Sequence, residues 1–121
     1  MSVSREETQE KMDRHRAGAV AVWTDPEYTV PACFAERAQR LARRTCLIYE
    51  DRPYTYADVD QASDVYAAVA RYLGLAPGEV GAVMVENRPE FFYAWLGLAR
   101  IGAIAGLLNT AARDRALSHA I

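Results

Sequence analysis

The pattern that most constrains the fold is an apolar run, an apolar helix and a second apolar run, joined by short connections. Val80 to Val85 is a continuous uncharged segment, as in strands covered on both faces, and we expect it to lie centrally in a sheet. A helix is predicted from about Pro89 to Ile101, with large apolar side chains over most of its circumference. Gly102 ends this helix, and Ala103 to Leu108 forms a further strand. This order indicates a parallel βαβ unit, so the predicted fold class is α/β.

Residues 1–24 are interpreted as a charged helical arm, and residues 25–121 as a separate unit. A capping box beginning at Ser4 predicts a helix from about Arg5 to Ala19. Met12 is the only large apolar residue of that helix, so we expect a loosely attached arm. Trp23 is expected to anchor its far end.

Two more helices and a hairpin are predicted between the arm and the βαβ unit. Tyr28 to Arg44 has the apolar spacing of an amphipathic helix, and Thr45–Tyr49 with Tyr54–Thr55 suggests a tight hairpin. Pro53 places the second strand at an edge. Thr55 also begins a capping box and a long helix. The apolar stripe of that helix is predicted at Val59, Ala62, Tyr66, Val69, Ala70 and Leu73.

Composition excludes several classes of function. With 14 basic and 16 acidic residues, the net charge of -2 provides no basic face for nucleic acid. The first sixteen residues lack the apolar core of a secretory signal, so a cytoplasmic location is expected. Phe91 to Leu108 is interrupted by Arg100 and is too short to span a bilayer. Cys33 and Cys46 lack metal-site spacing and are expected to be reduced, partly buried residues.

Polar side chains follow both strands of the predicted βαβ unit. Glu86 and Asn87 follow the first strand, and Asn109, Thr110 and Arg113 follow the second. Open α/β sheets bind ligands at the carboxyl ends of their strands, so the last three are weak candidates for substrate binding. Helix capping by Asn87 and turn formation by Asn109 are the structural alternatives.

No combination of residues supplies a nucleophile, a base and an orienting partner, so we assign no catalytic residue. His15 and His119 have no carboxylate or cysteine at ligand spacing, and no metal site is predicted. Three glycines do not match a phosphate-binding loop, and we expect them to let the βαβ helix lie close to the strand after it: Gly97, Gly102 and Gly106. Five tyrosines are assigned to the core and to no ligand: Tyr54, Tyr56, Tyr66, Tyr72 and Tyr93.

Several motifs are similar to those of the adenylate-forming superfamily, which includes acyl-CoA synthetases, luciferases and peptide-synthetase adenylation domains. Tyr54 to Val59 resembles its first core motif, and Leu98 to Asn109 resembles its second. The joint spacing of three runs looks most like the very-long-chain acyl-CoA synthetase and fatty-acid transport branch: Glu86-Asn87-Arg88-Pro89-Glu90-Phe91, Trp95-Leu96-Gly97-Leu98-Ala99-Arg100 and Asn109-Thr110-Ala111-Ala112-Arg113. Ala111 departs from this pattern, which often has asparagine at that position. Gly81 departs as well, since it replaces an expected branched residue, and it should weaken its strand.

The resemblance implies that residues 25–121 are part of an amino-terminal AMP-binding subdomain, with a β-hairpin and a parallel βαβ unit flanked by helices. It implies ATP-dependent, AMP-forming ligation of a long- or very-long-chain fatty acid to coenzyme A, with magnesium. Peripheral association with a membrane is a further expectation. The alternatives are a ligase for another carboxylic acid and a non-catalytic binding or scaffold module.

The family's nucleotide-binding loop, ribose-binding aspartate and mobile-domain lysine have no counterpart up to Ile121. We therefore expect this segment to bind no cofactor and to be inactive by itself. The remainder of a domain, or a second copy, is the expected partner. A last helix is predicted from near Arg113 or Asp114, with Leu117 and Ile121 on its apolar face.

Overall fold

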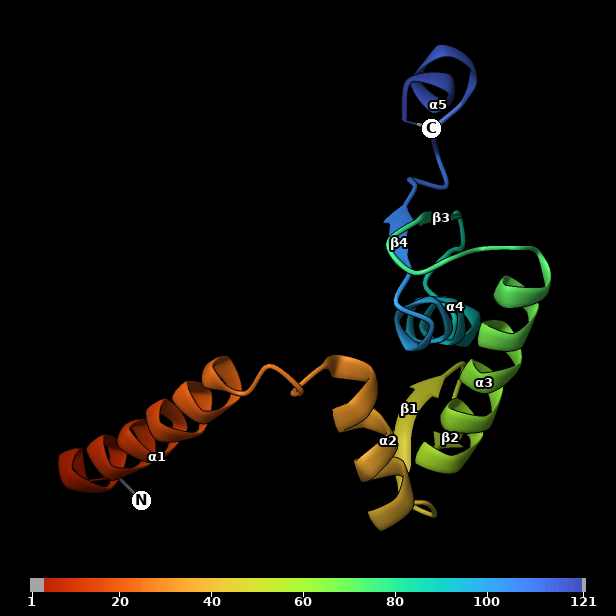
Figure 1. The fold of residues 1–121 in the computed structure, drawn as a ribbon. Coiled ribbons are helices and arrows are strands. Elements are labelled where there is room, and N and C mark those ends of the chain that lie inside the picture. The colour runs from red at the N-terminus through yellow and green to blue at the C-terminus, as the bar shows by residue number, and fades with distance from the viewer. Residues whose placement is uncertain (1–3, 121) are drawn as a thin grey trace.

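The computed structural model describes residues 4–120, so the predicted position of Ile121 on a helix face lies outside the described residues. The helices are α1 (Arg5–Thr24), α2 (Val30–Arg40), α3 (Tyr56–Tyr72), α4 (Pro89–Arg100) and α5 (Asp114–Ala120). The strands are β1 (Thr45–Tyr49), β2 (Arg52–Thr55), β3 (Val80–Val83) and β4 (Ile104–Leu107). β1 and β2 form an antiparallel hairpin and β3 and β4 a parallel pair, which confirms the α/β class (Figure 1).

The helix α1 extends away from the other elements (Figure 1). It begins at the predicted capping box, in which the Ser4 hydroxyl accepts from the Glu7 amide and the Glu7 carboxylate accepts from the Ser4 amide. None of its residues is buried. The expected anchoring by Trp23 is wrong, because 91% of this residue is exposed. An indole holds a helix end only where other side chains cover it, and here none do.

The hairpin follows α2 closely. Thr29 caps α2 and Ala38 is its buried residue. Glu50 and Asp51, the two residues between the strands, both have left-handed φ values, of 49° and 61°. Two such residues form the tight hairpin turn whose twist matches that of the flanking strands.

The helix α3 begins at the second predicted capping box. The Thr55 hydroxyl accepts from the Asp58 amide at 3.1 Å, and the Asp58 carboxylate accepts from the Thr55 amide at 2.8 Å. The backbone hydrogen bond from Thr55, followed by its side-chain hydrogen bond, lowers the pKa of Asp58 below its ordinary value. The carboxylate therefore stabilises the folded chain above its unfolded pKa of about 4. That contribution is lost as the pH falls through the lower folded pKa.

Replacing Thr55 by alanine should lower the free energy of unfolding by about 1 kcal/mol, because one amide of the first turn loses its acceptor. The acid-dependent contribution of Asp58 should shrink with it. Urea unfolding at pH 7 and at pH 3 measures both effects. Thr24→Ala is the matched control, since the Thr24 hydroxyl bonds only to carbonyls of its own exposed helix. An unchanged stability of Thr55→Ala would contradict the capping role.

The βαβ unit has the predicted order and parallel register. Val80 lies opposite Ile104, and Val83 opposite Leu107. Gly102 ends α4 with a left-handed φ of 74°. The expectation that the first strand is central is wrong for the described residues, because β3 pairs only with β4 and 62% of Val80 is exposed. An apolar run is suited to a doubly covered strand, but covering it requires neighbours.

The N-cap of α4 is Arg88, and the predicted capping by Asn87 is wrong. Proline disfavours helical geometry in the residue before it, and Arg88 before Pro89 is extended, with φ −142° and ψ 165°. The Arg88 side chain instead holds both carboxylate oxygens of Glu90, at 2.7 and 3.0 Å. These hydrogen bonds hold the pKa of Glu90 below its ordinary value.

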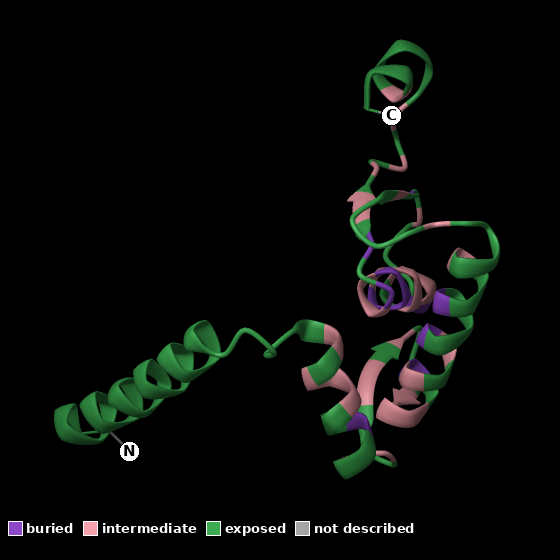
Figure 2. Cartoon of the chain, in the orientation of Figure 1, coloured by how far each residue is buried: buried purple, intermediate pink, exposed green. Residues whose placement is uncertain are grey.

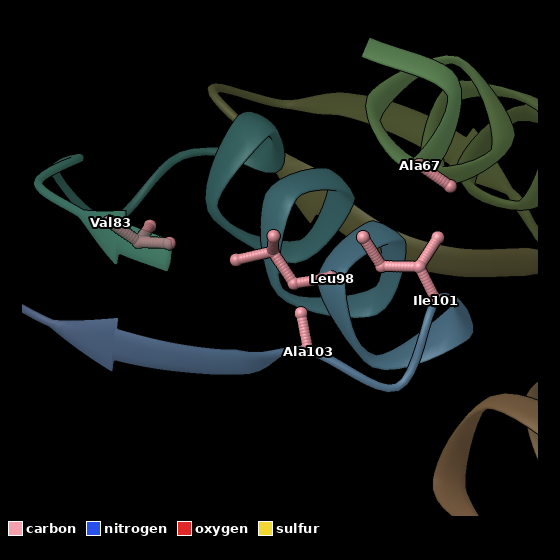
Figure 3. Packing of buried hydrophobic residues seen from close by; sticks show 5 residues of the cluster. All are labelled: Ala67, Val83, Leu98, Ile101 and Ala103. Atoms are coloured by element: carbon pink, nitrogen blue, oxygen red, sulfur yellow. The ribbon is translucent and has the colours of Figure 1, made fainter. Parts of the chain in front are cut away.

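The core lies where α4 meets α3 and the parallel strands. Figure 3 shows its buried residues, which come from α3, β3, α4 and the turn after α4: Ala67, Val83, Leu98, Ile101 and Ala103. Figure 2 shows how few positions elsewhere are buried. The face that α3 buries consists of Val59, Ser63 and Ala67.

The predicted apolar stripe of α3 is therefore only partly correct. Val59 belongs to the buried face, but half of Val69 and 76% of Leu73 are exposed. Ser63 can be buried because its hydroxyl is satisfied: it donates to the Val59 carbonyl of its own helix. The assignment of Tyr72 to the core is also wrong, since 90% of it is exposed.

Candidate functional site

The carboxyl ends of β3 and β4 lie at the same edge of the parallel sheet. The Leu108 amide donates to the Val83 carbonyl at 2.9 Å, immediately beyond the paired residues. The loops that carry the sequence-predicted polar residues therefore leave the sheet side by side. This is the position where open α/β sheets bind ligands.

The candidates after β4 use their polar groups to close a turn. The Asn109 side-chain oxygen accepts from the Ala111 amide at 2.9 Å, and its carbonyl accepts from the Ala112 amide. Arg113 donates to the carbonyls of Thr110 and Ala112, both at 2.7 Å. Amide-closed turns of this kind are common before helices, and α5 follows directly. The geometry thus favours the structural alternative for these residues, and their role in substrate binding stays a prediction.

The polar residues that follow β3, Glu86 and Asn87, lie near the hairpin. The Glu86 carbonyl accepts from the Arg88 amide at 2.8 Å. A hydrogen bond with Glu50, and then the charge of Glu50, raise the pKa of Tyr49. The charge of Arg88 lowers this pKa, and the charge of Glu86 raises it. A cavity of about 310 Å³ opens between β1 and the start of α4. Its walls are mainly apolar and include Leu47, Ile48, Asn87, Arg88, Phe91 and Phe92.

An ion-pair cluster that the sequence analysis missed joins α3 to α4. Arg100 donates to the carboxylates of both Asp60 and Asp64, and its side chain is 14% exposed. Burial alone lowers the pKa of Arg100, but the hydrogen bonds to Asp60 and Asp64 outweigh it, so the pKa is raised. One sequence feature could have predicted this cluster: an arginine ends an apolar helix, and two aspartates lie one turn apart on another helix. This cluster fixes the helix pair, and the Arg100 guanidinium is engaged by protein carboxylates.

The glycines of the βαβ unit do not form a phosphate cradle. A Cβ on Gly97 would lie 2.8 to 2.9 Å from atoms of α3, and one on Gly106 would lie 2.9 Å from a Val80 methyl group. Gly97 therefore packs against α3, and not against the following strand as expected. Since protein atoms fill the space beside Gly97 and Gly106, neither glycine leaves room for a phosphate.

Gly81 also has a packing role. A Cβ at this position would lie 3.0 Å from Leu98 and 3.2 Å from Leu75. The small residue therefore lets these leucines approach β3, which offsets part of the packing loss expected from a glycine in a strand.

The remaining candidate groups are dispersed. Among residues 4–120, no group of three histidine, cysteine, aspartate or glutamate side chains could hold a metal ion. Cys33 and Cys46 are free and partly buried, as predicted. Burial raises the pKa of the Cys46 thiol. Within the described range, none of the helices combines the length and hydropathy required to cross a bilayer.

The sequences of known proteins match this chain over most of its length. Residues 34–121 match the model of the AMP-binding enzyme family. The mouse (Mus musculus) long-chain fatty acid transport protein 1 is 40% identical over 95 residues, which are 77% of this chain and 15% of that protein. The medium/long-chain-fatty-acid–CoA ligase FadD6 of Mycobacterium tuberculosis is 36% identical over 93 residues, 77% of this chain and 16% of the ligase. The chain thus spans about a sixth of the length of these relatives.

The same relationship appears in solved structures. The N-terminal subdomain of Klebsiella oxytoca NpsA, in complex with anthranilyl-AMSN, matches 75% of this chain with a TM-score of 0.71 and 31% identity. The match covers 24% of that subdomain. The o-succinylbenzoate CoA synthetase of Bacillus subtilis matches 64% of this chain and 16% of its own, with a TM-score of 0.61 and 35% identity. The fold is that of part of the amino-terminal subdomain of adenylate-forming enzymes, and the chain belongs to the AMP-binding enzyme family.

Proposed function

We propose that this chain forms the amino-terminal scaffold of an ATP-dependent, AMP-forming ligase that joins long- or very-long-chain fatty acids to coenzyme A. The observation that carries the proposal is the 36–40% identity to a fatty acid–CoA ligase and a fatty acid transport protein over 93–95 residues. The part of the chain that matches the AMP-binding enzyme family, residues 34–121, includes the βαβ unit and the loops after β3 and β4. We propose further that groups binding ATP, magnesium and coenzyme A belong to other parts of the ligase.

The contribution of the described residues is structural. The Arg100 cluster and the Gly97 contact hold α4 against α3, and α4 in turn supports β3 and β4. The two loops leaving this sheet would then form one wall of the substrate site. A rigid support of this kind positions groups that come from elsewhere in the fold.

A chimeric ligase tests the proposed substrate class. Residues 34–120 of this chain, which lie within the family match, would replace the corresponding segment of FadD6. We expect the chimera to form acyl-CoA from palmitate and longer acids, because the graft preserves the scaffold. The control is FadD6 carrying an unrelated α/β segment of equal length, which should be inactive.

The same assay decides the alternative of another acid. NpsA structures contain anthranilyl and hydroxybenzoyl ligands, so anthranilate and 3-hydroxybenzoate are the competing substrates to include. A folded chimera that has lost all fatty acid activity, or that prefers an aromatic acid, would contradict the proposed class.

A further inference from the structure

The charges of α1 are segregated around the helix. Successive residues of an α-helix are rotated by about 100°, so the sequence fixes which side chains share a side. The acidic residues of α1 all fall on one half of the circumference: Glu6, Glu7, Glu10 and Asp13. The other half contains no acidic residue and is called the basic face below; it is defined by Arg5, Lys11, Met12, Arg16, Val22 and Trp23.

The order of side chains across the basic face is that of a helix lying on a charged surface. Met12 and Val22 belong to a stripe along its middle, with Lys11 on one side and Arg16 on the other. Long basic side chains in such positions keep their charge in a polar layer while their aliphatic stems cover apolar neighbours. Arginines and lysines are as numerous in α1 as carboxylates, so an attraction to anionic groups arises from this arrangement and not from the net charge.

The apolar side chains of the basic face are accessible. Met12 is 58% exposed and Trp23 is 91% exposed. The end of the helix, residues 17–24, carries no charged side chain. Tryptophan is enriched at membrane surfaces, where its ring is covered and its N–H keeps a polar partner. The charge pattern is set by the helix itself, so it does not depend on which further segments the ligase contains.

The mixture of basic and apolar groups favours a lipid surface over a protein partner. The buried centre of a protein interface is poor in charged residues, whereas Lys11 and Arg16 border the apolar stripe of this face directly. In a two-fold pair of copies the same surface faces itself, so the basic residues of the two helices would repel each other. An anionic bilayer instead offers negative headgroups beside an apolar layer.

From these observations we infer that α1 binds the surface of a membrane that contains anionic lipids, with its basic face toward the bilayer. Val22 and Trp23 enter the headgroup boundary, Lys11 and Arg16 contact the headgroups, and the acidic half faces water. The apolar area of the face is small, so the binding requires anionic lipid and is reversible. The inference rests on α1 alone, and its failure would leave the proposed ligase function unchanged.

Co-sedimentation of the whole chain with vesicles measures this binding. Vesicles of equal parts phosphatidylserine and phosphatidylcholine should bind the chain. Vesicles of phosphatidylcholine alone should bind it about 25-fold more weakly or less, because each basic residue near an anionic surface strengthens binding about fivefold. Added salt should release the chain from the anionic vesicles, since the screening length falls from about 10 Å at 0.1 M to about 3 Å at 1 M.

A charge exchange tests the basic face at constant composition. Glu10→Lys combined with Lys11→Glu places a carboxylate on the basic face and leaves the net charge unchanged. Binding to the anionic vesicles should fall about 25-fold, because one attraction is lost and one repulsion is added. The matched control is Glu36→Arg combined with Arg40→Glu, which exchanges an exposed pair in α2 and should bind as the unmodified chain does. Circular dichroism checks that both variants keep their helices.

Trp23 provides a second measurement that does not involve the charges. In Trp95→Phe, Trp23 is the remaining tryptophan, and its fluorescence should shift to shorter wavelength when anionic vesicles are added. Trp23→Ala should weaken vesicle binding about tenfold, because a large apolar side chain is no longer covered. Trp23→Phe keeps most of the apolar area and should restore most of the binding.

Four outcomes would overturn the inference. The first is a chain that does not sediment with anionic vesicles. The second is equal binding to both kinds of vesicle, which would assign the contact to an apolar surface elsewhere. The third is equal binding by the folded charge-exchanged variant, or binding without a change in Trp23 fluorescence. The fourth is binding to polyglutamate but not to vesicles, which would indicate an acidic protein surface as the partner.

Discussion

Replacing Gly97 by alanine is expected to lower the free energy of unfolding by about 2 kcal/mol, because the added methyl group cannot be accommodated. Its Cβ would lie 2.8 Å from the Tyr66 Cβ and 2.9 Å from the Ala67 nitrogen and the Ser63 carbonyl oxygen. Two of these atoms belong to the α3 backbone, which cannot move aside as a flexible side chain would. The helices would have to separate, although α4 itself gains from losing a glycine.

Urea unfolding followed by circular dichroism at 222 nm measures this loss. Gly18→Ala is the matched control, because Gly18 also lies inside a helix and a Cβ there would meet nothing within 4 Å. That variant should leave the unfolding midpoint of the core unchanged or raise it. If Gly97→Ala were as stable as the unmodified protein, the close contact between α3 and α4 would be wrong.

Replacing Arg100 by alanine should cost about 2–3 kcal/mol, because Asp60 loses its partner in a partly buried place. The side chains of Arg100 and Asp60 are 14% and 29% exposed, so water compensates for little of the lost interaction. Asp64 is 67% exposed and should contribute less. Arg100 also covers part of the interface between α3 and α4 with its aliphatic stem.

The same urea experiment measures the Arg100 effect, with Arg40→Ala as the control. Arg40 pairs with Glu36 at 3.2 Å, but their side chains are 72% and 64% exposed. Exposed pairs contribute little, so the control should change stability by less than about 0.5 kcal/mol. Equal effects of the two substitutions would show that the Arg100 cluster is solvated and of little importance.

Local signals predicted the elements of this fold well. The capping boxes at Ser4 and Thr55 mark the starts of α1 and α3, and Gly102 marks the end of α4. These signals are reliable because the residues that satisfy a helix end lie within a few positions of it in the chain. The parallel pairing of β3 and β4 followed from the order of elements and the short connections.

Burial was harder to predict because it depends on which surfaces meet. Leu73 and Val80 are as apolar as core residues, yet both are largely exposed. Apolar character shows that a side chain is suited to a covered position, but not that a neighbour lies there. Gly97 was expected to pack against the strand that follows α4, and this was wrong for the same reason, because Gly97 packs against α3.

The candidate site was predictable in position but not in contacts. The order of strands places the loops after β3 and β4 at one edge, as expected. Whether Asn109 faces a ligand or closes a turn depends on the backbone of Ala111, which the sequence pattern does not describe. The cluster around Arg100 was missed because its aspartates lie 36 and 40 residues away in the sequence.

The most direct test of the proposed division between scaffold and chemistry is palmitate-dependent exchange of radiolabelled pyrophosphate into ATP. It would be measured side by side on the purified chain and on the FadD6 chimera described above. We predict exchange by the chimera and none above the protein-free blank for the chain alone. Protein atoms fill the space beside Gly97 and Gly106, and Arg100 and Arg113 are held by carboxylates and turn carbonyls. Exchange by the chain alone, or its absence from a folded chimera, would contradict this division.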